Sequence, residues 1–220
     1  MSRETETQTP PPAAPSPRTQ PYVRSEDRRE MIADAARALI AEKGVEGLRT
    51  RDVAARVGIN ISTLHFHVKS KAGLLELVAR SSRDAYLAML PPDPDPAGDP
   101  LVQLRAEAQV YFDSLRDRPD LSICFARLAL AAPGDPVLAA MIEEFTTGWG
   151  DRFRRILTHG RDQGVFRANL DPVAGATMVA GTLTAFARRG EPVLRMYWAV
   201  YEEIERSLLA PSPKESEDVG

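Results

Sequence analysis

The chain has 220 residues, of which 43% are hydrophobic, and its formal net charge is −3. This length is sufficient for one or two domains with hydrophobic cores, and the composition is typical of a globular protein. The single cysteine, Cys124, excludes an internal disulfide framework, and no apolar run approaches the roughly 20 residues of a membrane-spanning helix. Because no secretory signal is visible, we expect a cytoplasmic protein with no membrane partner.

The charge is unevenly distributed along the chain. Residues 1–80 contain 13 Lys and Arg against 10 Asp and Glu, whereas residues 81–220 contain 15 against 21. The first part is therefore positive and the second negative. This asymmetry favours a contact between the first part and an anionic partner such as a nucleic acid.

The first 24 residues are predicted to be a disordered tail, because six prolines lie among polar residues before position 22. A solvated tail is the simpler interpretation. The alternative is a flexible arm whose Arg18 and Arg24 contact a DNA backbone. Residues 211–220 are likewise predicted to be a disordered tail.

The remaining chain is rich in helix-forming residues, and its apolar residues recur at three- and four-residue spacing, so we expect an all-α protein. The first helix is predicted over 25–43, before Gly44. Its buried stripe consists of Ile32, Ala36, Leu39 and Ile40.

Two short helices are predicted next, over 51–57 and 61–68, with the chain reversal at Gly58 between them. Thr50 and Asn60 are suited to cap their first turns. The apolar residues predicted to face inward are Val53, Ala54, Val57, Leu64 and Val68.

A fourth helix, capped by Ser70, is predicted over 71–89 and ends at the proline-rich run 91–96. Five further helices are predicted over 101–116, 121–132, 136–160, 172–188 and 192–209, which gives about nine in total. Asp135 and Asp171 each precede a proline, which marks the start of the helix that follows.

Residues 49–75 have the spacing of a helix-turn-helix, a motif that places one helix in the DNA major groove, although this pattern alone occurs in many helical proteins. The stretch closely resembles the DNA-binding core of the TetR family of bacterial repressors. The resemblance is carried by the residues Thr50-Arg51, Gly58-Ile59-Asn60, Thr63-Leu64, Ser70-Lys71 and Leu74-Leu75. The chain has His65 and Val68 where the family usually has Tyr and often has Phe.

The resemblance extends less specifically to Gly164–Pro172, before the penultimate helix. It implies a helix-turn-helix DNA-binding domain over 25–70 and a ligand-binding and dimerisation domain over 71–210. The implied activity is that of a transcriptional repressor that a small effector releases from a palindromic DNA operator.

The residues expected to contact DNA lie in and around the second of the two short helices. Ile61 is suited to pack on a thymine methyl group, and Thr63 to bond a base edge or a phosphate. For Phe66, partial core packing is an equal alternative, and Thr50 also has a capping role. The expected DNA contacts are Thr50, Arg51, Asn60, Ile61, Ser62, Thr63, His65, Phe66, His67, Lys69 and Lys71.

Between the fourth helix and the last two helices, aromatic residues and methionine recur at helical spacing. The resemblance implies that they enclose an effector pocket, and few charges lie among them, which favours an apolar or aromatic effector; the alternative is plain core packing. Cys124 is expected to be inert, with a redox switch as the alternative. The predicted pocket residues are Tyr111, Phe112, Leu115, Cys124, Phe125, Leu128, Met141, Phe145 and Trp149.

The last two predicted helices carry small residues followed by large apolar ones. The resemblance implies that they form a four-helix bundle with a second subunit, whereas an intrachain core is the alternative. The predicted interface residues are Ala176, Ala180, Thr184, Tyr197, Tyr201 and Ile204.

No cofactor, metal or catalytic residue is predicted. His65 and His67 are roughly 200° apart around a helix and are poorly placed to chelate one ion, even with His159 as a third candidate. Protonation of either imidazole would instead strengthen a phosphate contact. The competing functions are a DNA-binding regulator without an effector and a helical enzyme.

Overall fold

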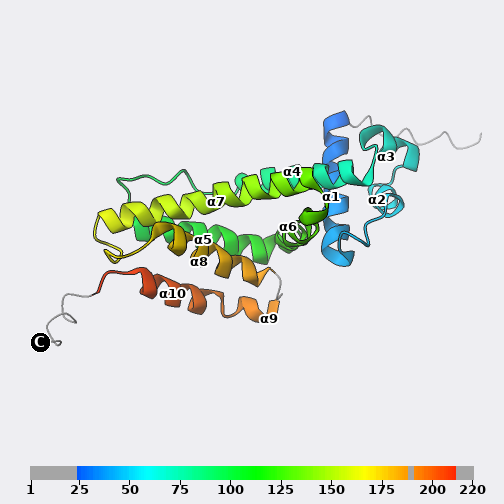
Figure 1. Cartoon of the computed structure of the whole chain (residues 1–220). Helices are drawn as coiled ribbons and strands as arrows, with labels where there is room; N and C mark the ends of the chain where they lie inside the picture. The colour runs from blue at the N-terminus through cyan, green and yellow to red at the C-terminus, as the bar shows by residue number, and fades with distance from the viewer. Residues whose placement is uncertain (1–23, 188–190, 212–220) are drawn as a thin grey trace, which may run out of the picture.

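The computed structural model describes residues 24–187 and 191–211. The predicted terminal tails, including Arg18, lie outside these residues apart from positions 24 and 211. Figure 1 shows an elongated arrangement in which α1, α2 and α3 form one end and the longer helices run away from them. The all-α prediction is confirmed across the described residues.

The helix boundaries follow the sequence pattern closely. The N-terminal helices are α1 (Ser25–Lys43), α2 (Thr50–Val57), α3 (Ile61–His67) and α4 (Lys71–Leu87). The longer body contains α5 (Pro100–Asp117), α6 (Pro119–Ala131), the 3₁₀ turn η1 (Ala132–Gly134), α7 (Pro136–Asp162), α8 (Pro172–Phe186), α9 (Glu191–Leu194) and α10 (Tyr197–Leu208).

One predicted helix is divided in two. The pattern over 192–209 predicted a continuous helix, but α9 ends at Leu194 and α10 begins at Tyr197. A turn that includes a hydrogen bond from the Met196 N–H to the Val193 carbonyl separates them. The break was missed because the apolar spacing continues across it.

Side-chain caps fix the start of several helices. Asn60 Oδ1 accepts a hydrogen bond from the Thr63 N–H at 2.7 Å, and Ser70 Oγ accepts one from the Gly73 N–H at 3.0 Å. Gly58 has φ of 73°, a conformation that favours glycine. The predicted cap at Thr50 is wrong, because Thr50 is the first residue of α2 and Arg49 precedes it without a side-chain cap bond.

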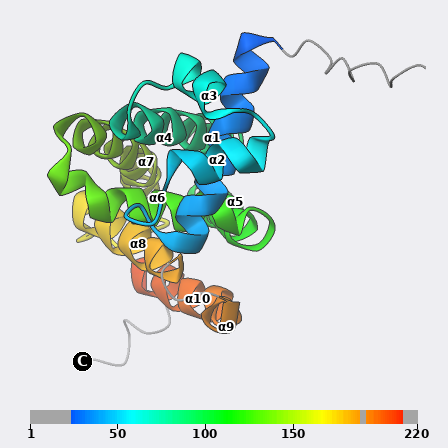
Figure 2. The same ribbon diagram turned by 90° about the vertical axis from the view of Figure 1, so that its right-hand side faces the viewer.

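The helices pack around two hydrophobic cores. The first core joins α1–α4 to α6 and the beginning of α7, and it includes Ile32, Leu64, Val78, Leu128 and Leu138. This core contains residues from both sides of position 70, so the predicted domain division there stays a prediction. Seen from the α1–α3 end, the remaining helices lie behind this group (Figure 2).

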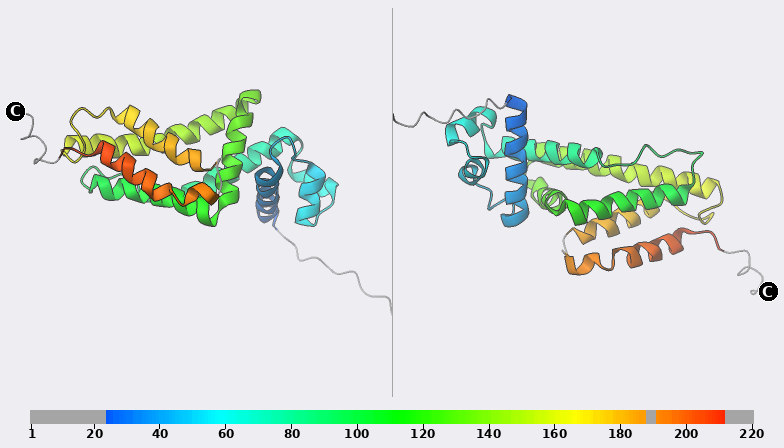
Figure 3. Two further views of the ribbon diagram at one scale, coloured as in Figure 1. Left: turned by 90° about the horizontal axis from the view of Figure 1, so that it is seen from below. Right: turned by 180° about the vertical axis from the view of Figure 1, so that it is seen from behind.

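The second core lies in the body, among α5, α7, α8 and α10 with the end of α4. Its fully buried side chains include Leu104, Phe153, Phe166, Tyr197 and Tyr201. The two views of Figure 3 show α8 beside α7 and α10 on the outer side of the body. None of the described helices is both long and apolar enough to cross a membrane.

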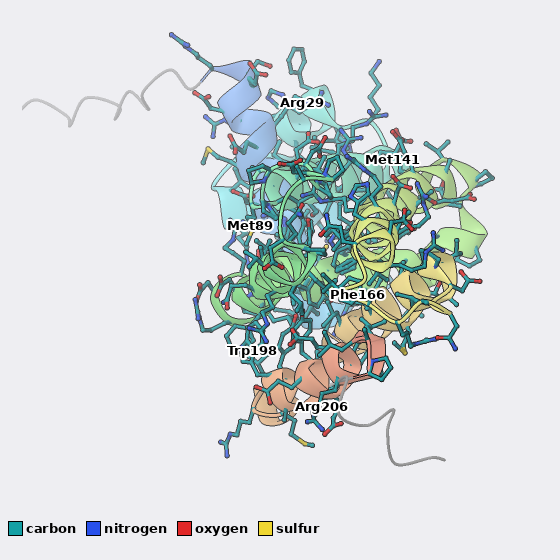
Figure 4. All side chains as sticks on the ribbon, turned by 90° about the vertical axis from the view of Figure 1, so that its left-hand side faces the viewer. Arg29, Met89, Met141, Phe166, Trp198 and Arg206 are labelled. Carbon is teal, nitrogen blue, oxygen red and sulfur yellow. The ribbon has the colours of Figure 1, made fainter. Side chains whose placement is uncertain are left out.

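The segment that follows α7 forms hydrogen bonds with the end of that helix. The Gly160 carbonyl accepts hydrogen bonds from the Val165 N–H at 2.9 Å and the Phe166 N–H at 3.0 Å. A methyl group at Gly160 would overlap the ring of Phe166, which Figure 4 shows within the body of the molecule. Gly160 is therefore required for this close approach.

We predict that Gly160→Ala lowers the free energy of unfolding by about 1–3 kcal/mol, because the added methyl group overpacks the core. Urea denaturation of the two proteins measures the change. Gly148→Ala on the same helix is the control, since a methyl group there has no neighbour within 4 Å. The control should gain up to about 1 kcal/mol from helix propensity; equal effects at the two positions would contradict the packing argument.

Candidate DNA-binding surface and buried cavity

Helix α3 presents most of its polar residues to solvent. Leu64 is buried in the first core, and Val68 beyond the helix joins it, which anchors one face of α3. Ile61, Ser62, His65 and Lys69 are exposed, whereas Thr63 and His67 are intermediate. The exposed side of α3 is thus free to enter a groove of DNA.

Phe66 is the most exposed large apolar residue of this helix, with 80% of its surface accessible. Its ring contacts only the edge of the His67 ring among the aromatic contacts of the described chain, at 5.3 Å between centroids. The alternative of core packing for Phe66 is therefore wrong. An exposed aromatic side chain on this surface is available for a partner.

The beginnings of α2 and α4 come together beside α3. Arg49, Thr50, Arg51 and Lys71 line one shallow groove. The sequence prediction included the last three of these residues, and Arg49 was missed because it precedes the predicted helix. Three cationic side chains and a hydroxyl in one groove are suited to hold a phosphate.

Two cations between α1 and α2 are already paired. Lys43 Nζ lies 3.0 Å from Asp52 Oδ2, and Arg56 Nη1 lies 2.9 Å from Glu42 Oε1. By contrast, Arg49, Arg51, Lys69 and Lys71 make no ion pair with any described residue. These four side chains therefore leave unpaired positive charge beside α3.

His67 lies between α3 and α1. Arg29 Nη1 donates a hydrogen bond to the His67 carbonyl at 3.4 Å. Partial burial, together with the positive charges of Arg29 and Arg28, lowers the pKa of the His67 imidazole below its ordinary value of 6.5. The imidazole is accordingly neutral near pH 7.

A second candidate site is a cavity of about 180 Å³ within the body. Its walls come from α4, α5, α6, α7 and α8. The lining residues are Ser82, Tyr86, Tyr111, Leu121, Ser122, Phe125, Ala126, Ala129, Phe145, Thr146, Trp149, Thr184 and Ala187. The cavity is thus built mainly from aromatic and small side chains.

Four of the nine predicted pocket residues line this cavity: Tyr111, Phe125, Phe145 and Trp149. The other five do not. Phe112 packs on Tyr197 and Trp198, and Leu115 packs against the same second core. Cys124, Leu128 and Met141 belong to the first core.

The Tyr86 ring contacts three other aromatic rings that line the cavity. Its ring centroid lies 5.5 Å from that of Phe145, 5.9 Å from that of Trp149 and 6.3 Å from that of Tyr111. Burial raises the pKa of the Tyr86 hydroxyl well above its ordinary value, so this group stays neutral. Tyr86 and Ser82 were missed as pocket residues, although they continue the four-residue spacing from Val78.

Cys124 does not have the environment of a reactive thiol. Burial raises its pKa to about 12, and the side chain is inaccessible to solvent. The thiolate that oxidation requires is therefore scarce at neutral pH. These observations favour the inert core role.

The predicted dimer residues lie in two environments. Ala176, Tyr197, Tyr201 and Ile204 are buried within the chain's own second core, and the Tyr197 hydroxyl donates to the Ala108 carbonyl at 2.6 Å. These four side chains are therefore unavailable to a partner, which corrects the prediction. Ala180 is partly buried, and Thr184 is exposed while also lining the cavity.

Besides Thr184, the exposed side of α8 contains residues that the prediction did not include. Val173 is 60% exposed, and Thr177, Met178 and Gly181 are also exposed. The sequence of α8 contains no charged residue. Sequence reasoning did not separate the inner from the outer side of α8, because an almost uniformly apolar helix has no periodicity that marks its outer side.

No cluster of three or more His, Cys, Asp and Glu residues that could hold a metal ion occurs among the described residues. His65 and His67 lie on α3, whereas His159 lies near the end of α7. The three histidines thus do not form one site.

Comparisons with known proteins agree with this arrangement. The family model for "Bacterial regulatory proteins, tetR family" matches residues 32–78. Tetracycline repressor protein class D of Escherichia coli is 47% identical over 51 residues, which are 23% of this chain and 23% of that protein. The chain therefore matches only about a quarter of that repressor's length.

Two further similarities extend beyond the helix-turn-helix. The transcriptional repressor KstR2 of Mycolicibacterium smegmatis is 27% identical over 147 residues, which cover 66% of this chain and 70% of the repressor. The solved structure of the ketosteroid transcriptional regulator KstR2 of Mycobacterium tuberculosis has a TM-score of 0.71 at 20% identity and covers 84% of this chain and 96% of that one. The helix-turn-helix of this chain, within residues 32–78, is therefore that of the TetR family of bacterial transcriptional regulators, and the fold of the chain is shared with the solved KstR2.

Proposed function

We propose that the chain is a homodimeric repressor that binds a palindromic DNA operator and is released from it by a small, mostly apolar effector. The observation that carries the DNA-binding part is the exposed side of α3 beside four cations that make no ion pair with described residues. The family assignment makes the chain a regulator and not an enzyme.

In the proposed complex, the beginning of α3 enters the major groove. Ile61, Ser62 and Thr63 face the bases, and Phe66 extends along the groove from the exposed side of the helix. Arg49, Thr50, Arg51 and Lys71 hold phosphates on the flanking backbone, which positions α3 without reading sequence.

We predict that a Thr63→Ala, Lys71→Ala double variant loses at least about tenfold in operator affinity, because it removes one base or phosphate contact and one charge. The Lys71 substitution should also reduce the slope of log affinity against log salt by about one. Fluorescence anisotropy with a labelled operator at several salt concentrations measures both quantities.

Arg161→Ala is the matched control, since Arg161 lies in the last turn of α7 at the other end of the molecule (Figure 1). It should leave affinity and salt slope unchanged. Unchanged operator affinity in the Thr63, Lys71 double variant would contradict the proposed DNA-binding surface.

We expect His67 to give the DNA contact a dependence on pH. Because the pKa of His67 is lowered, operator affinity should be flat between about pH 8 and 7 and should rise only below about pH 6.5, where the imidazole gains a proton. Anisotropy titrations at fixed salt measure this. A His67→Gln variant should lose the rise; a rise that persists in it would assign the effect to other groups.

Dimerisation is proposed to use the uncharged outer face of α8, around Val173, Thr177, Met178 and Gly181. Small residues at Thr177 and Gly181 permit a close approach between helices. A dimer is required because a helix-turn-helix repressor gains affinity by occupying two half-sites about one or more turns apart.

We predict that Met178→Glu shifts the protein to a monomer at micromolar concentration, because the carboxylate would be buried without a partner. Light scattering after gel filtration measures the mass. Val102→Glu on α5 is the control, since Val102 is 62% exposed and also apolar. If both variants remain dimeric, the proposed α8 face is wrong.

The effector is proposed to occupy the cavity and to act through α4. Ser82 and Tyr86 of α4 line the cavity, while Lys71 at the beginning of the same helix lies in the phosphate groove. A ligand that displaces the cavity end of α4 would therefore move the DNA-binding end. The solved relative is named as a ketosteroid regulator, which supports an effector of apolar character.

A further inference from the structure

Two buried hydrogen-bond donors in the cavity wall have no acceptor. The Tyr86 hydroxyl on α4 and the Trp149 indole Nε1 on α7 make no hydrogen bond with any described residue. Both residues line the cavity, and their ring centroids lie 5.9 Å apart. A buried donor without a partner costs free energy, and an acceptor supplied by a ligand would remove that cost.

The serine and threonine hydroxyls of the cavity are already engaged. Ser82 Oγ accepts from Arg37 Nε at 3.1 Å, and Ser122 Oγ lies 3.0 Å from Ser114 Oγ. Thr146 Oγ1 donates to the Ile142 carbonyl at 2.9 Å, and Thr184 Oγ1 donates to the Ala180 carbonyl at 2.9 Å. The buried donors of Tyr86 and Trp149 remain open to a ligand.

The lining also restricts the charge of a ligand. None of the residues that line the cavity is Lys, Arg, His, Asp or Glu. A charged group placed there would lose its hydration without gaining an opposite charge. The cavity therefore selects against carboxylates, phosphates and amines.

The volume restricts the size. A dry apolar cavity of about 150 Å³ binds benzene, and this one measures about 180 Å³. The space suits one aromatic ring with a small substituent, and it is too small for a steroid or a long acyl chain. Edge-to-face contacts from the surrounding aromatic rings favour a planar ring.

We infer that the ligand of this cavity is an uncharged, single-ring aromatic compound whose oxygen acceptor receives a hydrogen bond from the Tyr86 hydroxyl, with the Trp149 indole as a second donor. This inference rests on the proposed function for the identity of the cavity as an effector site. It specifies the chemical class that the proposed function left open.

The test is calorimetric titration of the full chain, without DNA, with three probes of equal non-hydrogen atom count. Acetophenone has a carbonyl acceptor, cumene has the same shape without one, and benzoate carries a charge. Acetophenone and cumene should both bind, and benzoate should bind at least about tenfold more weakly than acetophenone because its charge is not compensated. Equal or tighter benzoate binding, or no binding of either neutral probe, would overturn the inference.

Tyr86→Phe removes only the hydroxyl oxygen and retains the ring. The ratio of acetophenone to cumene affinity should fall about five- to tenfold in this variant, which is the loss of one hydrogen bond. Tyr201→Phe is the matched control, because Tyr201 is also a buried tyrosine but lies outside the cavity wall. An unchanged ratio in Tyr86→Phe would contradict the role of the hydroxyl.

Ala126→Leu provides a second variant that fills the cavity and leaves both donor residues in place, and it should weaken the binding of acetophenone and cumene alike. Because these titrations contain no DNA, their failure would leave the operator-binding measurements unaffected. Conversely, loss of operator binding with intact probe binding would reject the proposed function alone. Neutral-probe binding that releases no operator would support the ligand class and reject the effector role.

Discussion

The arrangement depends on α4, which belongs to both hydrophobic cores. Leu74, Leu75 and Val78 pack into the first core, while Tyr86, two turns further on, packs into the second. Arg37 of α1, 2% exposed, secures the middle of the helix by bonding Ser82 Oγ at 3.1 Å and Ser81 Oγ at 2.7 Å. Closely packed interiors transmit displacement instead of absorbing it. The position of the phosphate groove is therefore tied to the packing around Tyr86.

The far end of α4 is restrained by a buried ionic group. Nη2 of Arg152, on α7, lies 2.6 Å from Glu107 Oε1. The same nitrogen donates hydrogen bonds to the carbonyls of Pro91 and Pro92, both at 2.8 Å. The segment that follows α4 is thereby attached to α5 and α7. Burial raises the pKa of Glu107 although Arg152 acts in the opposite direction. Such a group fixes geometry, since a buried ion pair contributes little net stability but is costly to break.

Local signals predicted the fold well because they act within a few residues. The caps at Asn60 and Ser70 and the glycine at Gly58 determine where helices begin and end, and all three were visible in the sequence. The cavity was only half predicted, since helical spacing shows that Cys124 and Phe125 are apolar but not which of them lines the cavity. The outer face of α8 was not identified for the same reason: inward and outward residues are chemically alike there. Tyr197 is the clearest case, as its hydroxyl is satisfied by Ala108, a residue distant in sequence that no local pattern indicates.

Thr184 is both exposed on α8 and part of the cavity wall. If a second subunit covers α8, the cavity has a different boundary in the dimer from the one it has in the single chain. Binding free energies are reciprocal, so a ligand that binds the two forms unequally must also change the association constant of the subunits by the same factor. Effector affinity would then vary with protein concentration near the dissociation constant of the dimer, and the cellular abundance of the regulator would set the effector level at which it responds.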